Sequence, residues 1–377
     1  MSGPLEGLKI LELAGIGPSP YACMLLADMG ADVLRLERGV FGAEASTTWD
    51  ILNRSRPSVA VDLKNEAGRD LVLELAEQAE VLIEGFRPGV TERLGLGPRD
   101  VWARNARLVY ARMTGYGQEG TLAQRAGHDI NYISVSGALW PLGRAESAPV
   151  PPLNLVGDFG GGALFLVVGV LAAVLESRAS GEGQVVDAAM VDGSASMMAM
   201  THAFLNSGYW REERGVNILD TGAHFYEVYE TKDRQFVAVG AIEAKFYEAL
   251  LRGLGLEHET LPMQMDREHW PEMKERFAAL FAAKTRDEWS AIFDGVDACV
   301  TPVLSPREAA VHPYNTERHV FSEEGPVQPQ PAPRFSRTPG SISRAPQSPG
   351  SGTRDGLARW GITLERQDEL RRAGAFG

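Results

Sequence analysis

Residues 8–37 read LKILELAGIGPSPYACMLLADMGADVLRLE, a segment with two apolar runs separated by a helix-length stretch. Residues 8–14 form an apolar run typical of a buried strand, and residues 31–37 form a second one. Between them a glycine and proline turn leads into an apolar segment near residues 20–29, which has the length of a helix. The stretch therefore predicts a strand–helix–strand unit with parallel strands.

The same alternation recurs along the first half of the chain. We expect further strands at residues 58–63, 81–86, 108–114 and 184–192, and helices near residues 66–78 and 98–105. Another helix should follow Gly157 in the apolar segment DFGGGALFLVVGVLAAVLE. Strands that alternate with helices predict an α/β fold: a Rossmann-like, doubly wound parallel sheet with helices on both faces.

Length and composition predict a large and a small domain. A chain of 377 residues is long enough for two domains. We expect a large domain at residues 1–205, a linker at 206–224, a smaller α+β domain at 225–305, and a return to the large domain at 306–377. The smaller domain should hold a strand at 235–242 and helices near 245–254 and 286–294. Ten of the 22 prolines lie in residues 301–350, which favours an extended arm there.

Charge and composition argue against several classes of partner. The net charge of -13 disfavours nucleic acid, because a phosphate backbone is bound by a basic surface. The apolar run at residues 163–175 is shorter than a bilayer-spanning helix, so we expect no membrane partner. Cys23 and Cys299 lie far apart in the sequence, and the N-terminus lacks the pattern of a signal peptide. We therefore expect a cytoplasmic protein.

The sequence also argues against NAD and metal cofactors. In the turn AGIGPSP, Gly15 and Gly17 match the first two glycines of a dinucleotide fingerprint, but Pro20 stands in place of the third. The seven histidines show no metal-ligand spacing. We expect no NAD and no metal.

Basic residues gather instead after the predicted strands. In open α/β sheets, ligands bind beyond the carboxyl ends of the strands, so these cations favour a phosphate-rich ligand. Scattered surface charge is the alternative for any single member. The residues are Arg38, Arg54, Arg56, Lys64, Arg87 and Arg93.

Three further residues are candidates for chemistry. His128, in a glycine-flanked loop after a strand, is placed to act as a general base or to be structural. Asp158 is expected as a helix N-cap, while the glycines at residues 160–162 would let a ligand approach the helix start. Glu243 follows a strand and begins a helix, where an acid is favoured by the helix dipole.

Long motifs over nearly the whole chain resemble one family. They include GPLEGLKILELAGIGPSPYACMLLADMGADVLRLER, the stretch from VDLKNEAGRD to ERLGLGP, and the shorter motifs ARMTGYGQEG, AGHDINYISVSG and PPLNLVGDFGGGALF. The chain resembles the alpha-methylacyl-CoA racemases of the CaiB/BaiF, or class III coenzyme A transferase, superfamily. The resemblance implies an interlocked homodimer.

The resemblance also implies roles for individual residues. His128 and Asp158 would be the two bases that exchange the alpha proton of a 2-methylacyl-CoA through an enolate. From the chemistry alone, we expect the helix start at residues 160–162 to stabilise the enolate oxygen. Glu243, from its own or the partner subunit, would orient His128. The coenzyme A site would comprise Arg38, Val61, Asp62, Leu63, Lys64, Gly85, Phe86, Arg87, Arg93, Gly127, Asp129, Ile130, Asn131 and Tyr132.

Two other functions stay open at this point. A class III CoA transferase would use Asp158 as a nucleophile rather than as a base. A noncatalytic acyl-CoA binding protein would use the arginines but neither His128 nor Asp158. The sequence does not choose among acyl chains.

Overall fold

The computed structural model describes residues 3–41, 50–323 and 325–376, and the chain divides into two compact units. The first unit comprises residues 1–136, 152–197 and 324–377. The second comprises residues 137–151 and 198–323, and it includes the stretch at 206–224 that was expected as a linker.

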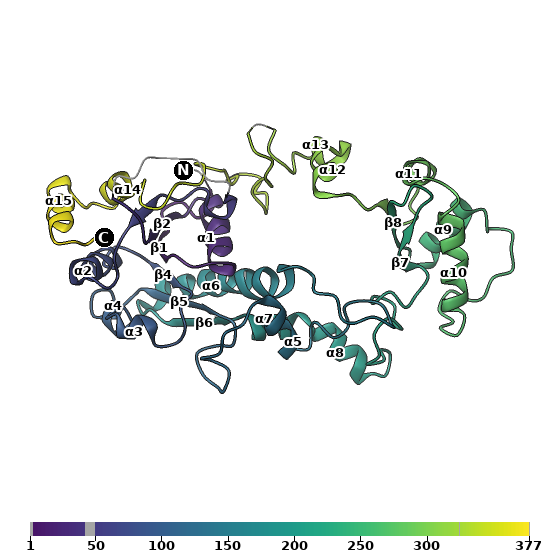
Figure 1. The fold of residues 1–377 in the computed structure, drawn as a ribbon, viewed down its shortest axis with the longest axis horizontal. Coiled ribbons are helices and arrows are strands. Elements are labelled where there is room, and N and C mark those ends of the chain that lie inside the picture. Colours follow the sequence, from purple (N-terminus) through teal and green to yellow (C-terminus); the bar gives the residue numbers. More distant parts are fainter. Residues whose placement is uncertain (1–2, 42–49, 324, 377) are drawn as a thin grey trace. The chain divides into compact units, whose positions relative to one another are not determined.

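A six-stranded parallel sheet forms the centre of the first unit (Figure 1). Its strand order is β3-β2-β1-β4-β5-β6, with the switch in direction of the winding between β1 and β4. All neighbouring pairs are parallel, which confirms the predicted Rossmann-like α/β class. The strands are β1 (Lys9–Leu13), β2 (Asp32–Glu37), β3 (Ser58–Ala60), β4 (Val81–Glu84), β5 (Val109–Thr114) and β6 (Val185–Ala189).

Helices cover both faces of this sheet. Successive residues of each strand point to opposite faces, and most residues on each face are apolar. Ile10 and Ile83 belong to the core on one face, while Leu11 and Leu82 belong to the core on the other. The first face packs against α1 (Pro18–Asp28), α5 (Asp129–Val135), α6 (Phe165–Ser180) and the start of α7 (Met190–Met197). The second packs against α2 (Glu66–Ala76), α4 (Pro98–Trp102), α14 (Thr353–Arg359) and α15 (Leu364–Arg372).

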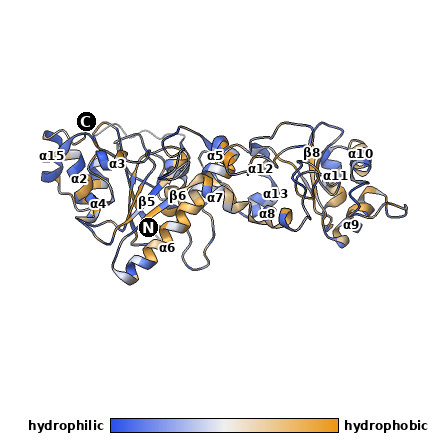
Figure 2. Cartoon of the chain, turned by 90° about the horizontal axis from the view of Figure 1, so that it is seen from below, coloured by the Kyte–Doolittle hydropathy of each residue, from blue (hydrophilic) through white to orange (hydrophobic). Residues whose placement is uncertain are grey.

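One long helix runs through the first face. A π-helical segment, η2 (Leu155–Leu164), continues directly into α6, so the helix is longer than the apolar run seen in the sequence. By length and composition it could cross a membrane, a test that buried helices of globular proteins also meet. Figure 2 shows α6 as a mostly hydrophobic helix, and its Leu166 and Val170 are fully buried in the core under the sheet.

The proline-rich segment after residue 324 returns to the first unit. Ser341 donates its N–H to the carbonyl of Asp28, and Gly352 donates to that of Ser58. The chain then forms α14 and α15, drawn in yellow beside the purple N-terminal strands in Figure 1. Trp360, at the end of α14, is fully buried, so the C-terminal segment completes the second face of the sheet.

The second unit has its own small sheet and core. An antiparallel sheet of order β7-β8-β9 combines β7 (Tyr226–Glu230), β8 (Phe236–Gly240) and β9 (Val300–Pro302). Aromatic side chains such as Phe225, Phe277 and Trp289 fill the core, which confirms an α+β unit. Its helices are α8 (Ala199–Asn206), α9 (Ala244–Leu254), α10 (Trp270–Phe281), α11 (Arg286–Phe293), α12 (Pro306–Val311) and α13 (Pro313–Glu317).

Candidate active site

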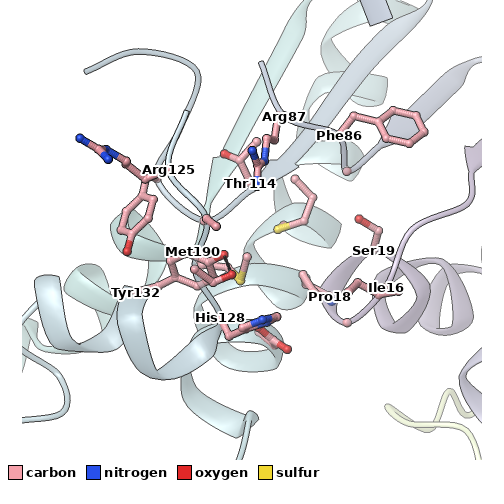
Figure 3. A pocket seen from close by; sticks show the side chains of 18 of the residues that line it. Ile16, Pro18, Ser19, Phe86, Arg87, Thr114, Arg125, His128, Tyr132 and Met190 are labelled. Atoms are coloured by element: carbon pink, nitrogen blue, oxygen red, sulfur yellow. Dashed lines mark hydrogen bonds between the residues drawn. The ribbon is translucent and has the colours of Figure 1, made fainter. Parts of the chain in front are cut away.

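A cavity of about 390 Å³ lies at the carboxyl ends of β1, β4 and β5 in the first unit. Its walls come from the turns after these strands, from the residues that begin α5, and from η2 and α7. Figure 3 shows His128 and Tyr132 on one side of this cavity and Ile16, Pro18 and Ser19 on the other. The crevice beyond the strand ends is where open α/β sheets bind ligands.

His128 stands immediately before α5, as the N-cap residue of that helix. Its backbone N–H donates to the Asn131 side chain at 3.0 Å, which fixes the start of the helix. One turn later, the Tyr132 hydroxyl donates to the carbonyl of Gly127. The Tyr132 ring also occupies the space that a side chain on Gly115 would fill. The backbone around His128 is therefore held, while its side chain remains exposed to the cavity.

Asp158 lies inside the helical segment and is not its N-cap, contrary to the prediction. The segment η2 begins at Leu155, and Asn154 is its N-cap residue. Asn154 and Asp158 are four residues apart and thus share one face, where the Asn154 amide donates to Asp158 Oδ2 at 3.3 Å. The backbone N–H of Asp158 donates to Asp129 Oδ2 at 2.7 Å. The carboxyl group lines the same cavity as His128.

The surroundings of Asp158 favour its protonated form. Burial raises the pKa of the Asp158 carboxyl above its ordinary value of 3.8. The hydrogen bond from Asn154 lowers this pKa, the negative charge of Asp129 raises it, and His128 lowers it. A carboxyl group with a raised pKa, facing a histidine across a cavity, can give a proton as well as take one.

The glycines at residues 160–162 serve helix packing and do not open the helix to a ligand, so that prediction is wrong. They lie within η2, after its first turn. A Cβ on Gly161 would come within 2.5 Å of the backbone of Ser194, and one on Gly162 within 2.8 Å of Met190. These glycines therefore let η2 approach α7 closely.

The turn after β1 lies close to the Asp158 carboxyl group. Gly17 has a φ of 68°, and a Cβ at this position would lie 3.0 Å from Asp158 Oδ2. Glycine is thus favoured by both its backbone conformation and the lack of space. The turn that resembles a dinucleotide fingerprint here forms a wall of the acid–base site.

A second cavity, of about 570 Å³, adjoins the first at the switch between β1 and β4. Ile16 and Phe86 line both cavities. The second cavity is also lined by five of the predicted coenzyme A residues, namely Arg38, Val61, Asp62, Leu63 and Lys64. A neighbouring hollow is lined by Lys64, Arg69 and Arg93, so three cations extend this region.

Two of the predicted ligand-binding arginines are structural. Arg54 is buried and its guanidinium binds Asp28 at 2.6 Å. Arg56 is buried and binds Glu12 at 3.0 Å. These arginines neutralise buried carboxylates, which leaves neither free for a phosphate group.

The remaining predicted residues fall into three groups. Gly85, Phe86, Arg87, Gly127 and Tyr132 line the active-site cavity with His128 and Asp158. Asp129, Ile130 and Asn131 belong to the first turn of α5; Asp129 is buried and holds Asp158, whereas Ile130 is exposed. Glu243 belongs to the second unit, where it precedes α9 as an exposed residue whose side chain makes no capping hydrogen bond.

Several residues of the site were missed from the sequence. Asn154 could have been found from its four-residue spacing to Asp158. Met113 brings an apolar, adaptable side chain to the cavity, but nothing in its local sequence separates it from a core methionine. Among the described residues, no group of three or more His, Cys, Asp or Glu side chains could hold a metal ion.

Comparisons with known proteins give a consistent result. A sequence model of the family described as CoA-transferase family III matches residues 5–354. The chain is 47% identical over 365 residues to alpha-methylacyl-CoA racemase of Mus musculus, covering 96% of this chain and 94% of that protein. It is 44% identical over 372 residues to alpha-methylacyl-CoA racemase of Homo sapiens, covering 97% and 96%. A CAIB/BAIF family protein from Brucella suis has the same fold, with a TM-score of 0.82 at 22% identity, covering 96% of this chain and 100% of that one.

Proposed function

This chain belongs to CoA-transferase family III, and on that premise we propose that it racemises 2-methylacyl-CoA thioesters at the alpha carbon. The observation that carries the proposal is the placement of His128 and Asp158 in one cavity, in a chain 44–47% identical to two racemases. One group removes the alpha proton from one face of the substrate. The other delivers a proton to the opposite face of the resulting enolate, which inverts the centre.

The pair must share one proton for both directions to operate. In one direction neutral His128 is the base and protonated Asp158 is the acid; in the other, Asp158 is a carboxylate and His128 an imidazolium. Burial raises the pKa of Asp158. The free-energy difference between the state with the proton on Asp158 and the state with the proton on His128 is therefore smaller. This environment supports reversible proton transfer between the two sides.

The enolate oxygen needs hydrogen-bond donors. The start of α5 directly follows His128. Asn131 donates its N–H to the His128 carbonyl, which leaves the N–H groups of Asp129 and Ile130 without an acceptor within the helix. We assign the stabilisation of the enolate to this helix start, in place of residues 160–162. A donor of this kind is worth about 3 to 4 kcal/mol in the transition state.

The second cavity is the proposed site for the nucleotide end of coenzyme A. Arg38, Lys64 and Arg93 provide positive charge for its phosphate groups. Arg87 lines the active-site cavity near the path between the two. The coenzyme would then pass Ile16 and Phe86 to place its thioester between His128 and Asp158.

We also propose that the enzyme is an interlocked homodimer, and that Glu243, from the same or the partner subunit, orients the imidazolium of His128. Support comes from an exposed apolar stripe on the long helix at Leu164, Val168 and Leu175, which are 47%, 66% and 69% exposed in the single chain. The stripe continues on one face of the helix and suits an interface with a second copy. Sedimentation analysis should give a dimer; a monomer at micromolar concentration would contradict this part.

The proposed reaction moves a proton and no electron or hydride, so it needs neither NAD nor a metal. Acyl-CoA is the proposed partner besides the second subunit, and the net charge of -13 supports the absence of nucleic acid. Free Cys23 and Cys299 suit a reducing, cytoplasmic location.

The family name itself keeps a CoA transferase as the alternative, with Asp158 as nucleophile. One experiment separates the two. Purified enzyme is incubated with (2R)-2-methylacyl-CoA, with and without an acceptor acid, and the recovered acids are resolved by chiral chromatography. Racemisation predicts conversion to a mixture of epimers in both reactions. Unchanged stereochemistry together with transfer of CoA to the acceptor would overturn the proposal.

A further inference from the structure

Ser19, near the start of α1, has a buried side chain that the two-base reaction does not use. The residue is 1% exposed, yet it lines the active-site cavity. Figure 3 shows its hydroxyl group at the edge of the cavity, between Pro18 and Phe86. Among the described residues its hydroxyl has no hydrogen-bond partner, and Oγ is not one of the fully buried atoms that lack a partner. The oxygen therefore opens into the cavity, where it can bond to a bound molecule.

Glycine at position 85 gives the Ser19 hydroxyl its space. A Cβ on Gly85 would lie 2.8 Å from Ser19 Oγ, so a side chain at position 85 would force the hydroxyl to turn away. The hydroxyl is thus directed over the turn that leads from β4 to Phe86. Pro18 and Pro20, on either side, have no backbone N–H, so Ser19 alone of these three residues carries hydrogen-bond donors.

The two cavities of the first unit meet at Ile16 and Phe86, so a ligand that fills both must lie across these residues. Ile16 and Phe86 line both the cavity of His128 and Asp158 and the cavity of Arg38 and Lys64. A ligand with its phosphates in one and its thioester in the other must cross between them. Ser19 lines the first cavity but not the second, and its Oγ lies beside Gly85, the residue before Phe86. It therefore lies next to this crossing, on the side of His128 and Asp158.

We propose that Ser19 is a substrate-binding residue whose hydroxyl donates a hydrogen bond to an amide carbonyl of the pantetheine arm. The inference rests on the proposed function, since it takes an acyl-CoA as the ligand. The arm that joins the nucleotide to the thioester carries two amide groups, and a buried amide without a partner is unfavourable. The hydroxyl supplies that partner away from the reacting carbon.

The first test is the variant Ser19→Ala, which removes the hydroxyl and keeps the Cβ. We expect KM for 2-methylacyl-CoA to rise roughly threefold to tenfold, with kcat unchanged, because a neutral hydrogen bond to the bound substrate is lost. Ser207→Ala, on an exposed residue of the second unit, is the control. An unchanged KM would overturn the assignment.

A shortened substrate locates the contact. The ethyl thioester of the same acid has no pantetheine arm, so Ser19→Ala should leave its alpha-proton exchange rate unchanged. Equal losses on both thioesters would show that the hydroxyl acts on the thioester itself, against the proposal.

Calorimetry with free CoA separates this inference from the proposed function. Free CoA has the pantetheine arm but no acyl group, so its Kd should rise roughly threefold to tenfold in Ser19→Ala. If the wild type binds CoA but fails to racemise, the proposed function falls while the Ser19 contact is still measured. An unchanged Kd would overturn the contact alone.

Discussion

Two groups of charged side chains in the first unit differ in how their charges are paired. Under α1, Glu12 binds Arg35 at 2.6 Å and Arg56 at 3.0 Å, and Asp28 binds Arg54. All of these side chains are buried. In the active-site cavity, Asp158 has a hydrogen bond from Asn154 but no ion pair with an arginine or lysine among the described residues, and His128 is exposed.

The comparison shows that pairing distinguishes structural from functional charges better than residue type or position. Arg38, Arg54 and Arg56 all follow predicted strands or lie near them. Arg54 and Arg56 are neutralised inside the protein, whereas Arg38 is exposed at the edge of the second cavity. Buried pairs maintain the fold, and the groups left unpaired face the ligand.

The largest effect should come from Asp158→Asn. The amide keeps the shape of the side chain but can neither donate the carboxyl proton nor take one as a base. We expect epimer interconversion to fall by roughly 10²- to 10⁴-fold, with the thermal transition retained. Chiral chromatography measures the rate, and Asp287→Asn, on an exposed side chain, is the control. A variant with undiminished activity would show that Asp158 is not one of the two bases.

A substitution at Glu12 should lower the stability of the fold, whereas the substitution at Asp158 lowers activity. The variant Glu12→Gln leaves Arg35 and Arg56 buried without their carboxylate, so the free energy of unfolding should fall by about 3 to 5 kcal/mol. Denaturant titration measures it. Glu74→Gln, which breaks an exposed pair with Arg366, should cost about 0 to 1 kcal/mol. Similar losses of unfolding free energy in the two variants would show that the buried ion pairs stabilise the fold no more than the exposed pair does.

A third comparison concerns Arg38 and Arg54, which should differ in their effects on substrate binding and on stability. Arg38→Gln should raise KM for the acyl-CoA about tenfold, since a charge-assisted contact to the ligand is lost, and should leave the unfolding transition unchanged. Arg54→Gln should lower the unfolding temperature and leave KM unchanged in the folded fraction. The two are distinguished by steady-state kinetics and thermal unfolding; a KM effect confined to Arg54→Gln would reverse the assignment.

The smallest effect is expected at Asn154. The hydrogen bond from Asn154 lowers the pKa of Asp158, so Asn154→Ala should raise that pKa further. Asp158 then stays protonated to higher pH, and the acidic limb of the kcat/KM profile for the direction that uses its carboxylate should move to higher pH. A shift to lower pH would contradict this role of Asn154.

Much of the fold followed from the sequence because its periodicity is strong. The six strands of the parallel sheet and the helices α1, α2, α4 and α6 were predicted, whereas α5, α7, α14 and α15 were not. In the second unit, β7, β9, α8, α10, α12 and α13 were missed. The strand β7 is only five residues long and follows a polar, glycine-containing stretch, while the apolar residues of α10 are diluted by charges.

The site was predicted less completely, because local sequence does not show what lies opposite a residue. His128 and Asp158 were identified as candidates, and the structure places both in one cavity. The role of the glycines at residues 160–162 was wrong, since only the folded chain brings α7 against them. The pairing of Arg54 with Asp28, 26 residues away, depends on the packing of α1.

Proton NMR in deuterium oxide follows the transfer of the alpha proton itself. Wild-type enzyme is mixed with (2R)-2-methylacyl-CoA, without an acceptor acid, and the alpha proton and its adjacent methyl signal are followed. We predict loss of the alpha-proton signal as deuterium enters, together with formation of the 2S epimer, and no such change with Asp158→Asn. An alpha proton that stays in place with the wild type would contradict two-base racemisation by His128 and Asp158.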